Sequence, residues 1–356
     1  MRIRTGLLIL AFAGGTASFA SAQDCSTHIT PETAAALLAQ EKAGAYALND
    51  KDRVRTEYLL QVPITFHIVR RTDGTGGIST TDVASTLDSA NVWWAATGIR
   101  FFQSGAFDYI SSDSLYLGVD TDAEFGTLWS TNAVPNTINV YFIGAMPGCG
   151  RSSFSPDAVQ GIAVRNDCTM QASYPTSLAH ELGHYFDLYH THETVFGVEC
   201  PDESNCSTAG DKVCDTPADP DVSKMGFLFA CTYVGTAMAC GNQAYFPDPT
   251  NLMSYGAACR NHFTQGQRDR ALATLINVRS SLIQAPGLNV TWVDFNFAFP
   301  FHTGSYTLPF DNLASAEAAT NVGGTVVIKT GSTRTGYTFT KALHWDSFRG
   351  VARIGP

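Results

Sequence analysis

Three histidines and one glutamate lie close together in the segment HELGHYFDLYH, residues 180–190. An α-helix advances by roughly 100° per residue, so His180 and His184 fall on one face, one turn apart, and both imidazoles can reach a single ion. Neutral imidazole is a good zinc ligand. Glu181 would project beside that ion, where a carboxylate can take a proton from a zinc-bound water. The spacing therefore predicts a hydrolytic zinc centre with Glu181 as its general base.

A third ligand requires the chain to turn back. His190 lies ten residues beyond His180, roughly 15 Å further along if the helix continued, so the helix must break just after His184. The segment resembles the metzincin metalloproteases, whose pattern H-E-x-x-H-x-x-G-x-x-H uses the glycine as this break. Here the glycine position holds Asp187, and aspartate is one of the residues that best tolerate a left-handed turn. We therefore expect His190 to be the third zinc ligand.

Further segments narrow the resemblance to one metzincin family, the pappalysins. The segment NLMSYG (251–256), followed by CRNHFTQGQRDRA (259–271), resembles the metzincin Met-turn and its pappalysin continuation. GDKVCDTP (210–217) is similar to the family segment between the zinc helix and the Met-turn. LLQVPITFHIVRR (59–71), with period-two apolar stretches, resembles the opening β-strand of that family. The likeness spans roughly residues 59 to 284.

The resemblance implies an α+β fold of metzincin type. We expect a twisted mixed β-sheet with two long helices above the cleft, the second carrying the zinc motif, and an irregular, disulfide-tied lower subdomain. The catalytic domain would cover 58–285, after a signal peptide (1–22) and a pro-segment (23–57). The β-rich tail (286–356) resembles the first coil of right-handed parallel β-helix proteins, and it is too short to stand alone because solenoids need about three repeats.

The resemblance also implies roles outside the zinc motif. Met253 would lie under the zinc site, which is physically the role of a core methionine. Tyr255 would either lie near the scissile carbonyl or pack as an ordinary buried tyrosine. In the family, GDKVCDTP can bind calcium, whereas its simpler interpretation is a turn. The hard oxygen atoms that calcium takes would come from Asp211, Asp215 and Thr216.

The first 22 residues, MRIRTGLLILAFAGGTASFASA, are typical of a secretory signal. They combine a basic start, an apolar run too short to span a bilayer and an A-x-A cleavage site at 20–22, so the mature chain would begin at Gln23. No other stretch is long enough for a membrane helix. We therefore expect a secreted protein.

Nine cysteines in an exported chain predict disulfides rather than thiol chemistry. A zinc finger is disfavoured because the sequence has no C-x-x-C pair. The family resemblance implies that Cys231 pairs with Cys259 and that Cys149 pairs with Cys168. It also implies that Cys240 pairs with either Cys200 or Cys206, and that the other of these two pairs with Cys214. Cys25 is then left over.

Cys25 begins the segment CSTHITPETAAALLAQ (25–40), which resembles the start of pappalysin pro-segments. In those zymogens a cysteine thiolate occupies the open zinc position and displaces the catalytic water, which keeps the enzyme silent. The alternative is a free or intermolecularly paired cysteine. The basic run KDRVR (51–55) would be a natural point of cleavage.

These features imply a secreted zinc endopeptidase that acts on proteins or peptides. Zinc held by three histidines would polarise the scissile carbonyl, and Glu181 would pass the proton of the attacking water to the leaving amine. The net charge of −10 argues against nucleic acid as a partner. Two alternatives exist. A decayed adhesion protein that kept the fold is disfavoured by the intact Glu181, and a hydrolase of non-peptide substrates is disfavoured by the Met-turn.

Overall fold

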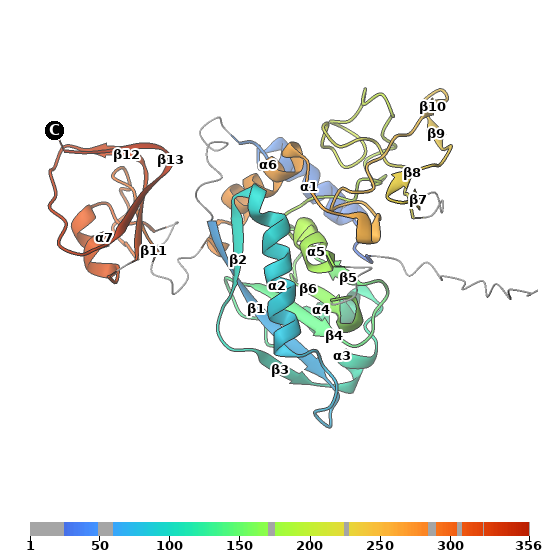
Figure 1. Ribbon diagram of the computed structural model, residues 1–356, viewed down its shortest axis with the longest axis horizontal. Helices are drawn as coiled ribbons and strands as arrows, with labels where there is room; N and C mark the ends of the chain where they lie inside the picture. The colour runs from blue at the N-terminus through green and yellow to red at the C-terminus, as the bar shows by residue number, and fades with distance from the viewer. Residues whose placement is uncertain are drawn as a thin grey trace, which may run out of the picture.

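The computed structural model describes residues 25–48, 60–169, 175–223, 228–283, 290–304, 308–322 and 324–355. The expected signal peptide and the basic run at 51–55 lie outside the described residues. Figure 1 shows a central part built on one sheet, crossed by the amino-terminal helix α1, and a separate tail at the carboxyl end.

A six-stranded mixed sheet forms the centre of the molecule, in the order β2-β1-β4-β6-β5, with β3 also paired to β1. All pairings are parallel except that of β5 with β6. Nearly every side chain of β1 is buried, because both faces of the sheet are covered. The strands are β1 (Leu60–Arg70), β2 (Ile99–Gln103), β3 (Asp108–Ser111), β4 (Ile138–Ile143), β5 (Gly150–Ser152) and β6 (Ile162–Arg165).

Helices cover the two faces of the sheet separately. On one face, α2 (Thr80–Trp94) and α5 (Ser177–Tyr185) pack on alternate residues of β1, and Trp94 contributes its indole ring to this core. On the other face lie α3 (Asp113–Leu117) and α4 (Asp122–Ser130), and α4 supplies Phe125 and Trp129 to a second core. The mixed sheet with helices on both faces has the α+β architecture expected from the sequence.

The zinc-motif helix differs from the expected long helix. α2 has 15 residues, whereas α5 has only nine. α5 ends at Tyr185 because the following residues must reverse the chain to return His190 to the helix. A longer helix would carry His190 away from His180 at 1.5 Å per residue.

The segment after the zinc helix is irregular and tied by disulfides. Its regular elements are the short pairs β7 (Leu228–Phe229) with β8 (Thr232–Tyr233) and β9 (Met238–Ala239) with β10 (Gln243–Ala244), then α6 (Gln265–Ala273). A capping box between Thr264 and Gln267 starts α6. Disulfides in this segment join Cys200 to Cys240, Cys206 to Cys214 and Cys231 to Cys259, and a fourth joins Cys149 to Cys168 before α5.

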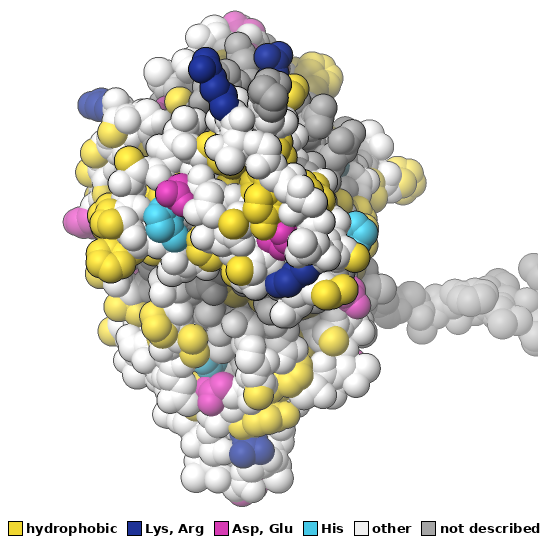
Figure 2. Space-filling model, turned by 90° about the vertical axis from the view of Figure 1, so that its left-hand side faces the viewer, with side chains coloured by type: hydrophobic (Ala, Val, Ile, Leu, Met, Phe, Trp, Pro, Cys, Tyr) yellow, Lys and Arg dark blue, Asp and Glu magenta, His cyan; other side chains and the backbone are white. Residues whose placement is uncertain are grey.

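The tail forms a three-stranded parallel sheet in the order β11-β12-β13. Its elements are β11 (Val290–Val293), α7 (Leu313–Ala319), β12 (Thr325–Thr333) and β13 (His344–Ile354). The tail has its own small core around Leu313, while Trp292 and Val327 join the core formed by the central sheet with α2 and α5. Figure 2 views the molecule from the side of the tail, and hydrophobic side chains are scattered there among polar ones. Among the described residues, no helix is both long and apolar enough to span a membrane.

Candidate metal centre

The reversal after α5 is made by the residue that replaces the metzincin glycine. Asp187 has φ 60°, the left-handed conformation expected for this position. The amide of Leu188 donates to the carbonyl of Gly183 at 2.9 Å, which closes the end of the helix. His190 therefore returns to the same face as His180.

The three imidazoles converge on one point. The Nε2 atoms of His180 and His184 are 3.2 Å apart, those of His184 and His190 are 3.0 Å apart, and those of His180 and His190 are 3.3 Å apart. Three nitrogens held tetrahedrally at about 2.0–2.1 Å from zinc would lie about 3.3–3.4 Å from one another. The triangle of nitrogens therefore fits one zinc ion.

Backbone carbonyls orient two of these rings. The Nδ1 of His180 lies 2.6 Å from the carbonyl of Leu252, and the Nδ1 of His184 lies 2.9 Å from that of Leu188. A proton on each Nδ1 leaves Nε2 as a lone-pair donor to a metal. Burial lowers the pKa of His184 to about 3 and that of His180 well below its usual value, so both rings stay neutral, the form that binds zinc.

A cysteine completes the cluster. The Sγ of Cys25 lies 3.6 Å from the Nε2 of His184, and one ligand atom each from Cys25 and the three histidines all lie within 4.8 Å of one another. A thiolate and an imidazole bound to the same tetrahedral zinc would have their ligand atoms about 3.6 Å apart. Cys25 is buried and is the free cysteine of the described chain. Burial raises the pKa of its thiol, and a bound metal ion would reverse that effect.

The carboxylate of Glu181 is also covered by the amino-terminal segment. The hydroxyl of Thr27 donates to Glu181 Oε2 at 3.0 Å and accepts the amide of Ser152 in β5 at 2.8 Å. The amide of Ser26 donates to the carbonyl of Gly150 at 2.9 Å. Residues 25–27 thus pair with the edge strand β5 and contact the carboxylate of Glu181 and the histidine cluster at once.

Met253 and Tyr255 take up positions on two sides of the cluster. Met253 is buried, and a Cβ added to Gly183 would meet its sulfur at 2.4 Å, so the helix needs glycine where the methionine packs beneath it. The hydroxyl of Tyr255 donates to the carbonyl of Cys25 at 2.8 Å, and its ring packs against His190. Tyr255 therefore faces the centre rather than the distant core.

Three further histidines, His67, His192 and His262, are not part of the cluster. His67 is buried in β1 between Asp108 at 2.8 Å and Asn139 at 3.0 Å. His192 stacks on His190 without joining the nitrogen triangle. His262 lies 3.1 Å from Asp248 and is partly exposed.

The carboxylate of Asp187 is buried and has specific partners. The amide and hydroxyl of Ser155 donate to it at 2.8 and 2.6 Å, and the hydroxyl of Tyr46 lies 3.3 Å away. Burial raises its pKa, while Arg279, Ser155 and Arg270 act in the opposite direction. Aspartate therefore supplies a tether to neighbouring segments that the metzincin glycine could not.

The calcium residues expected from GDKVCDTP differ in burial, and Thr216, like Asp211, is buried. Asp211 is buried, whereas Asp215 is exposed and accepts the amide of Gly266 at the start of α6. Glu199, which the sequence did not single out, packs against Gly210. Both carboxylate oxygens of Glu199 and Oδ2 of Asp211 are buried without a hydrogen-bond partner among the described residues. No sequence signal pairs Glu199 with this loop, because it precedes the loop in an irregular segment.

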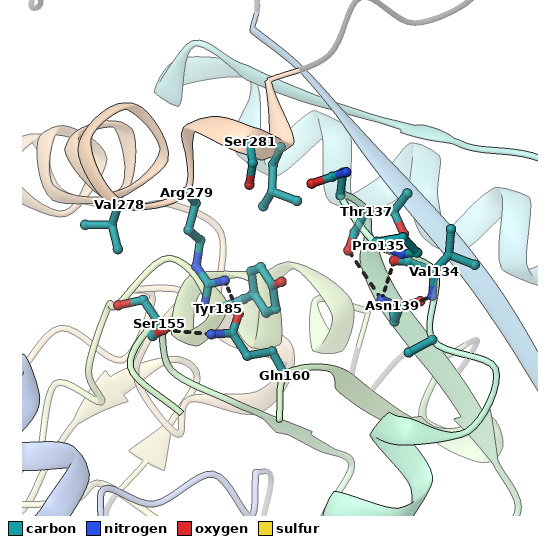
Figure 3. A pocket seen from close by; sticks show the side chains of 13 residues that line it. Val134, Pro135, Thr137, Asn139, Ser155, Gln160, Tyr185, Val278, Arg279 and Ser281 are labelled. Atoms are coloured by element: carbon teal, nitrogen blue, oxygen red, sulfur yellow. Dashed lines mark hydrogen bonds between the residues drawn. The ribbon is translucent and has the colours of Figure 1, made fainter. Parts of the chain in front are cut away.

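A separate pocket of about 480 Å³ lies away from the histidine cluster (Figure 3). It is bounded by the 133–139 segment and by Ser155, Gln160 and Arg279. The guanidinium of Arg279 stacks on the ring of Tyr185 at 3.7 Å and donates to the side-chain oxygen of Gln160. None of the expected site residues lines this pocket.

Comparisons with known proteins agree with this geometry. The family model for the M43 peptidases, described as pregnancy-associated plasma protein-A, matches residues 151–276. An extracellular metalloprotease of Colletotrichum graminicola is 27% identical over 229 residues, which cover 59% of this chain and 74% of that protein. An extracellular metalloprotease of Podospora anserina is 27% identical over 268 residues, which cover 69% and 82%.

The structure of a promirolysin mutant from Tannerella forsythia matches with a TM-score of 0.52 at 15% identity, covering 73% of this chain and 97% of that chain. At this identity the likeness shows the fold. The fold, the family match and the histidine cluster define a zinc metalloendopeptidase of the metzincin class. Within that class, residues 151–276 match the pappalysin family model.

Proposed function

We propose that this chain is secreted as a latent zinc endopeptidase and acts on proteins or peptides after its pro-segment is removed. The convergence of Cys25 with His180, His184 and His190 carries this proposal. Secretion is supported by the signal-like residues 1–22 and by relatives that are named extracellular metalloproteases. In this proposal residues 23–57 are the pro-segment, 58–285 the catalytic domain and 286–356 the β-rich tail.

In the active form, three histidines would hold the metal and leave its fourth position for water and substrate. Zinc in such a site lowers the pKa of water and polarises a carbonyl. Glu181 would take the proton of the attacking water and deliver it to the leaving amine. Tyr255, whose hydroxyl now binds the carbonyl of Cys25, would turn that hydroxyl to the substrate carbonyl when the pro-segment leaves.

In the latent form, the pro-segment would block the same groups one by one. Cys25 would take the fourth metal position, and Thr27 would occupy the carboxylate of Glu181. The backbone of Ser26 pairs with β5, so the pro-segment would also fill an edge on which an extended substrate can bind by strand addition. Latency would therefore combine ligation of the metal by Cys25 with a hydrogen bond from Thr27 to the carboxylate of Glu181.

Replacing His190 tests the proposed ligand set. In a Cys25→Ala background, where no thiol can substitute for a lost ligand, His190→Ala should lose tightly bound zinc as fully as His184→Ala. His192→Ala is the matched control, because its ring stacks on His190 but does not join the triangle, and it should keep one zinc per chain. Metal content after dialysis, with peptide cleavage before and after chelation, is the measurement. Stoichiometric zinc in His190→Ala would place the third ligand elsewhere.

We also propose a calcium site formed by Asp211 and Glu199. Their buried carboxylate oxygens without partners fit a hard divalent cation, which prefers carboxylate and carbonyl oxygens. Asp215, which is exposed and accepts the amide of Gly266 at the start of α6, would not be a ligand. Calcium would stabilise the irregular loops between the zinc helix and the Met-turn.

Calcium should raise thermal stability more at pH 8 than at pH 5. Burial, with a smaller effect of Glu203, raises the pKa of Glu199 to about 7 in the fold, and Asp211 beside it is raised as well. Without calcium, stability is then lost as the pH rises from the ordinary carboxyl pKa of about 4.3 through the folded value, because ionisation costs more in the folded chain. Calcium binds the ionised form and offsets that cost.

The measurement is the melting temperature with and without calcium at fixed free zinc. Glu199→Gln should abolish the calcium response and Asp215→Asn should keep it. A full response in Glu199→Gln together with none in Asp215→Asn would return the site to the residues first expected from the sequence.

A further inference from the structure

The two ends of the described pro-segment contact the catalytic domain at two separate places, and between them Thr33 of α1 donates to Asp157 while Leu37 packs with Phe154 and Tyr189. One is the metal centre, reached by residues 25–27. The other lies at the far end of α1 (Pro31–Lys42) and the turn that follows it, residues 40–47, which lie beside α6 (Figure 1). We call the protease surface that receives residues 40–47 the distal anchor. It consists of Ser155, Asp187, Tyr189, Lys212, Arg270 and Asn277.

The side chain of Tyr46 makes the central contact of the distal anchor. The guanidinium of Arg270 lies between two rings, 4.1 Å from the centre of Tyr46 and 4.2 Å from that of Tyr189. The Nε of Arg270 also donates to the carbonyl of Asp187 at 2.8 Å, and the hydroxyl of Tyr46 lies 3.3 Å from the carboxylate of Asp187. A buried guanidinium between two aromatic rings is a favourable cation–π arrangement.

Polar contacts on both sides of Tyr46 fix the same segment. Glu41 forms an ion pair with Lys212, whose side chain is only 6% exposed. The side-chain amide of Asn277 donates to the backbone carbonyls of Ala45 and Ala47 at 2.9 and 3.1 Å. These bonds recognise the backbone of the turn as well as its side chains, so they specify its conformation.

The position of these contacts in the chain decides what a cut would release. All of them lie between residues 40 and 47, and the basic run at 51–55 follows them. Cleavage in that run would separate the pro-segment from β1 without breaking any contact at the metal centre or the distal anchor. Both ends of the pro-segment would remain bound.

We propose that the distal anchor is an independent binding site for the pro-segment. It retains the excised segment as a non-covalent inhibitory peptide after cleavage at 51–55, so that activity appears only when the segment dissociates or is cut again. The inhibitory consequence rests on the proposed latency through Cys25. The binding itself does not, because residues 40–47 are held by other contacts.

The test uses the full-length protein with a sequence-specific protease site replacing residues 51–55. After complete cutting, size-exclusion chromatography over time gives the rate at which the excised segment leaves, and peptide cleavage is measured on the same samples. Tyr46→Ala and Glu41→Gln weaken the anchor from the side of the pro-segment, and Lys212→Met weakens it from the protease side. Glu32→Gln is the matched control for Glu41→Gln, since Glu32 is exposed on the same helix.

We expect the wild-type segment to co-elute with the protease, and Tyr46→Ala to release it about tenfold faster, the loss that one buried cation–π contact predicts. Lys212→Met and Glu41→Gln should also release it faster, while Glu32→Gln should match wild type. Cys25→Ala should be active yet still retain the cut segment longer than a Tyr46→Ala, Cys25→Ala double variant. Equal release from these last two proteins would overturn the anchor. If uncut Cys25→Ala were as inactive as uncut wild type, the proposed latency through Cys25 would be refuted. The retention of the cut segment by the distal anchor would still be tested by the release rates.

Discussion

Glu181→Gln is expected to bind zinc like the wild type but to lose peptide cleavage by about a thousandfold in kcat, within the range for removal of a general base. The substitution keeps the size of the side chain and its place beside the histidines, so the three imidazoles still converge. A neutral amide cannot accept the proton of the attacking water. The loss should therefore fall on turnover and leave metal content unchanged.

This experiment requires the open form of the enzyme. Glu181→Gln is compared with its parent in the Cys25→Ala background, using one fluorogenic peptide and a measurement of bound zinc. Glu193→Gln is the matched control, because Glu193 follows the metal-binding segment and, among the described residues, its carboxylate accepts the backbone amides of the next two residues. Cleavage by Glu181→Gln within tenfold of the control would show that another group accepts the proton.

Full-length Cys25→Ala is expected to cleave peptides without processing, about a hundredfold faster than full-length wild type. A tethered thiolate competes with water for the fourth metal position at a high effective concentration, and alanine cannot ligate. The closeness of Cys25 Sγ to His184 Nε2, at 3.6 Å, supports this expectation. The residual block by Thr27 on Glu181 should keep the rate below that of a chain freed of its pro-segment.

Ser26→Ala separates this effect from general loosening of the pro-segment. Within the part of the chain that the structure describes, its hydroxyl donates to the carbonyl of Gly150, and the backbone pairing with β5 survives the change. Initial rates of full-length wild type, Cys25→Ala and Ser26→Ala are compared on the same peptide. Equal rates for wild type and Cys25→Ala would rule out a switch at the metal and leave Cys25 as an ordinary buried thiol.

The sequence by itself determined the parts of the centre that depend on local geometry. His180, Glu181 and His184 lie within little more than one helical turn. The period of the α-helix therefore sets the relative directions of their side chains before any tertiary contact forms. The need for a reversal before His190 follows from the same geometry, and Asp187 adopts the left-handed conformation that this reversal requires. The opening strand was also predictable, because residues 59–71 contain period-two apolar stretches.

Only the tertiary structure decided which distant groups meet this centre. Cys25 and His184 are 159 positions apart, and Tyr46 and Asp187 are 141 apart, so no periodicity in the sequence relates them. The place of Glu199 near Asp211 has the same cause, since the path of an irregular, disulfide-tied loop is set by long-range packing. Local spacing specifies how neighbouring side chains point, whereas contacts between remote segments depend on how the whole chain packs.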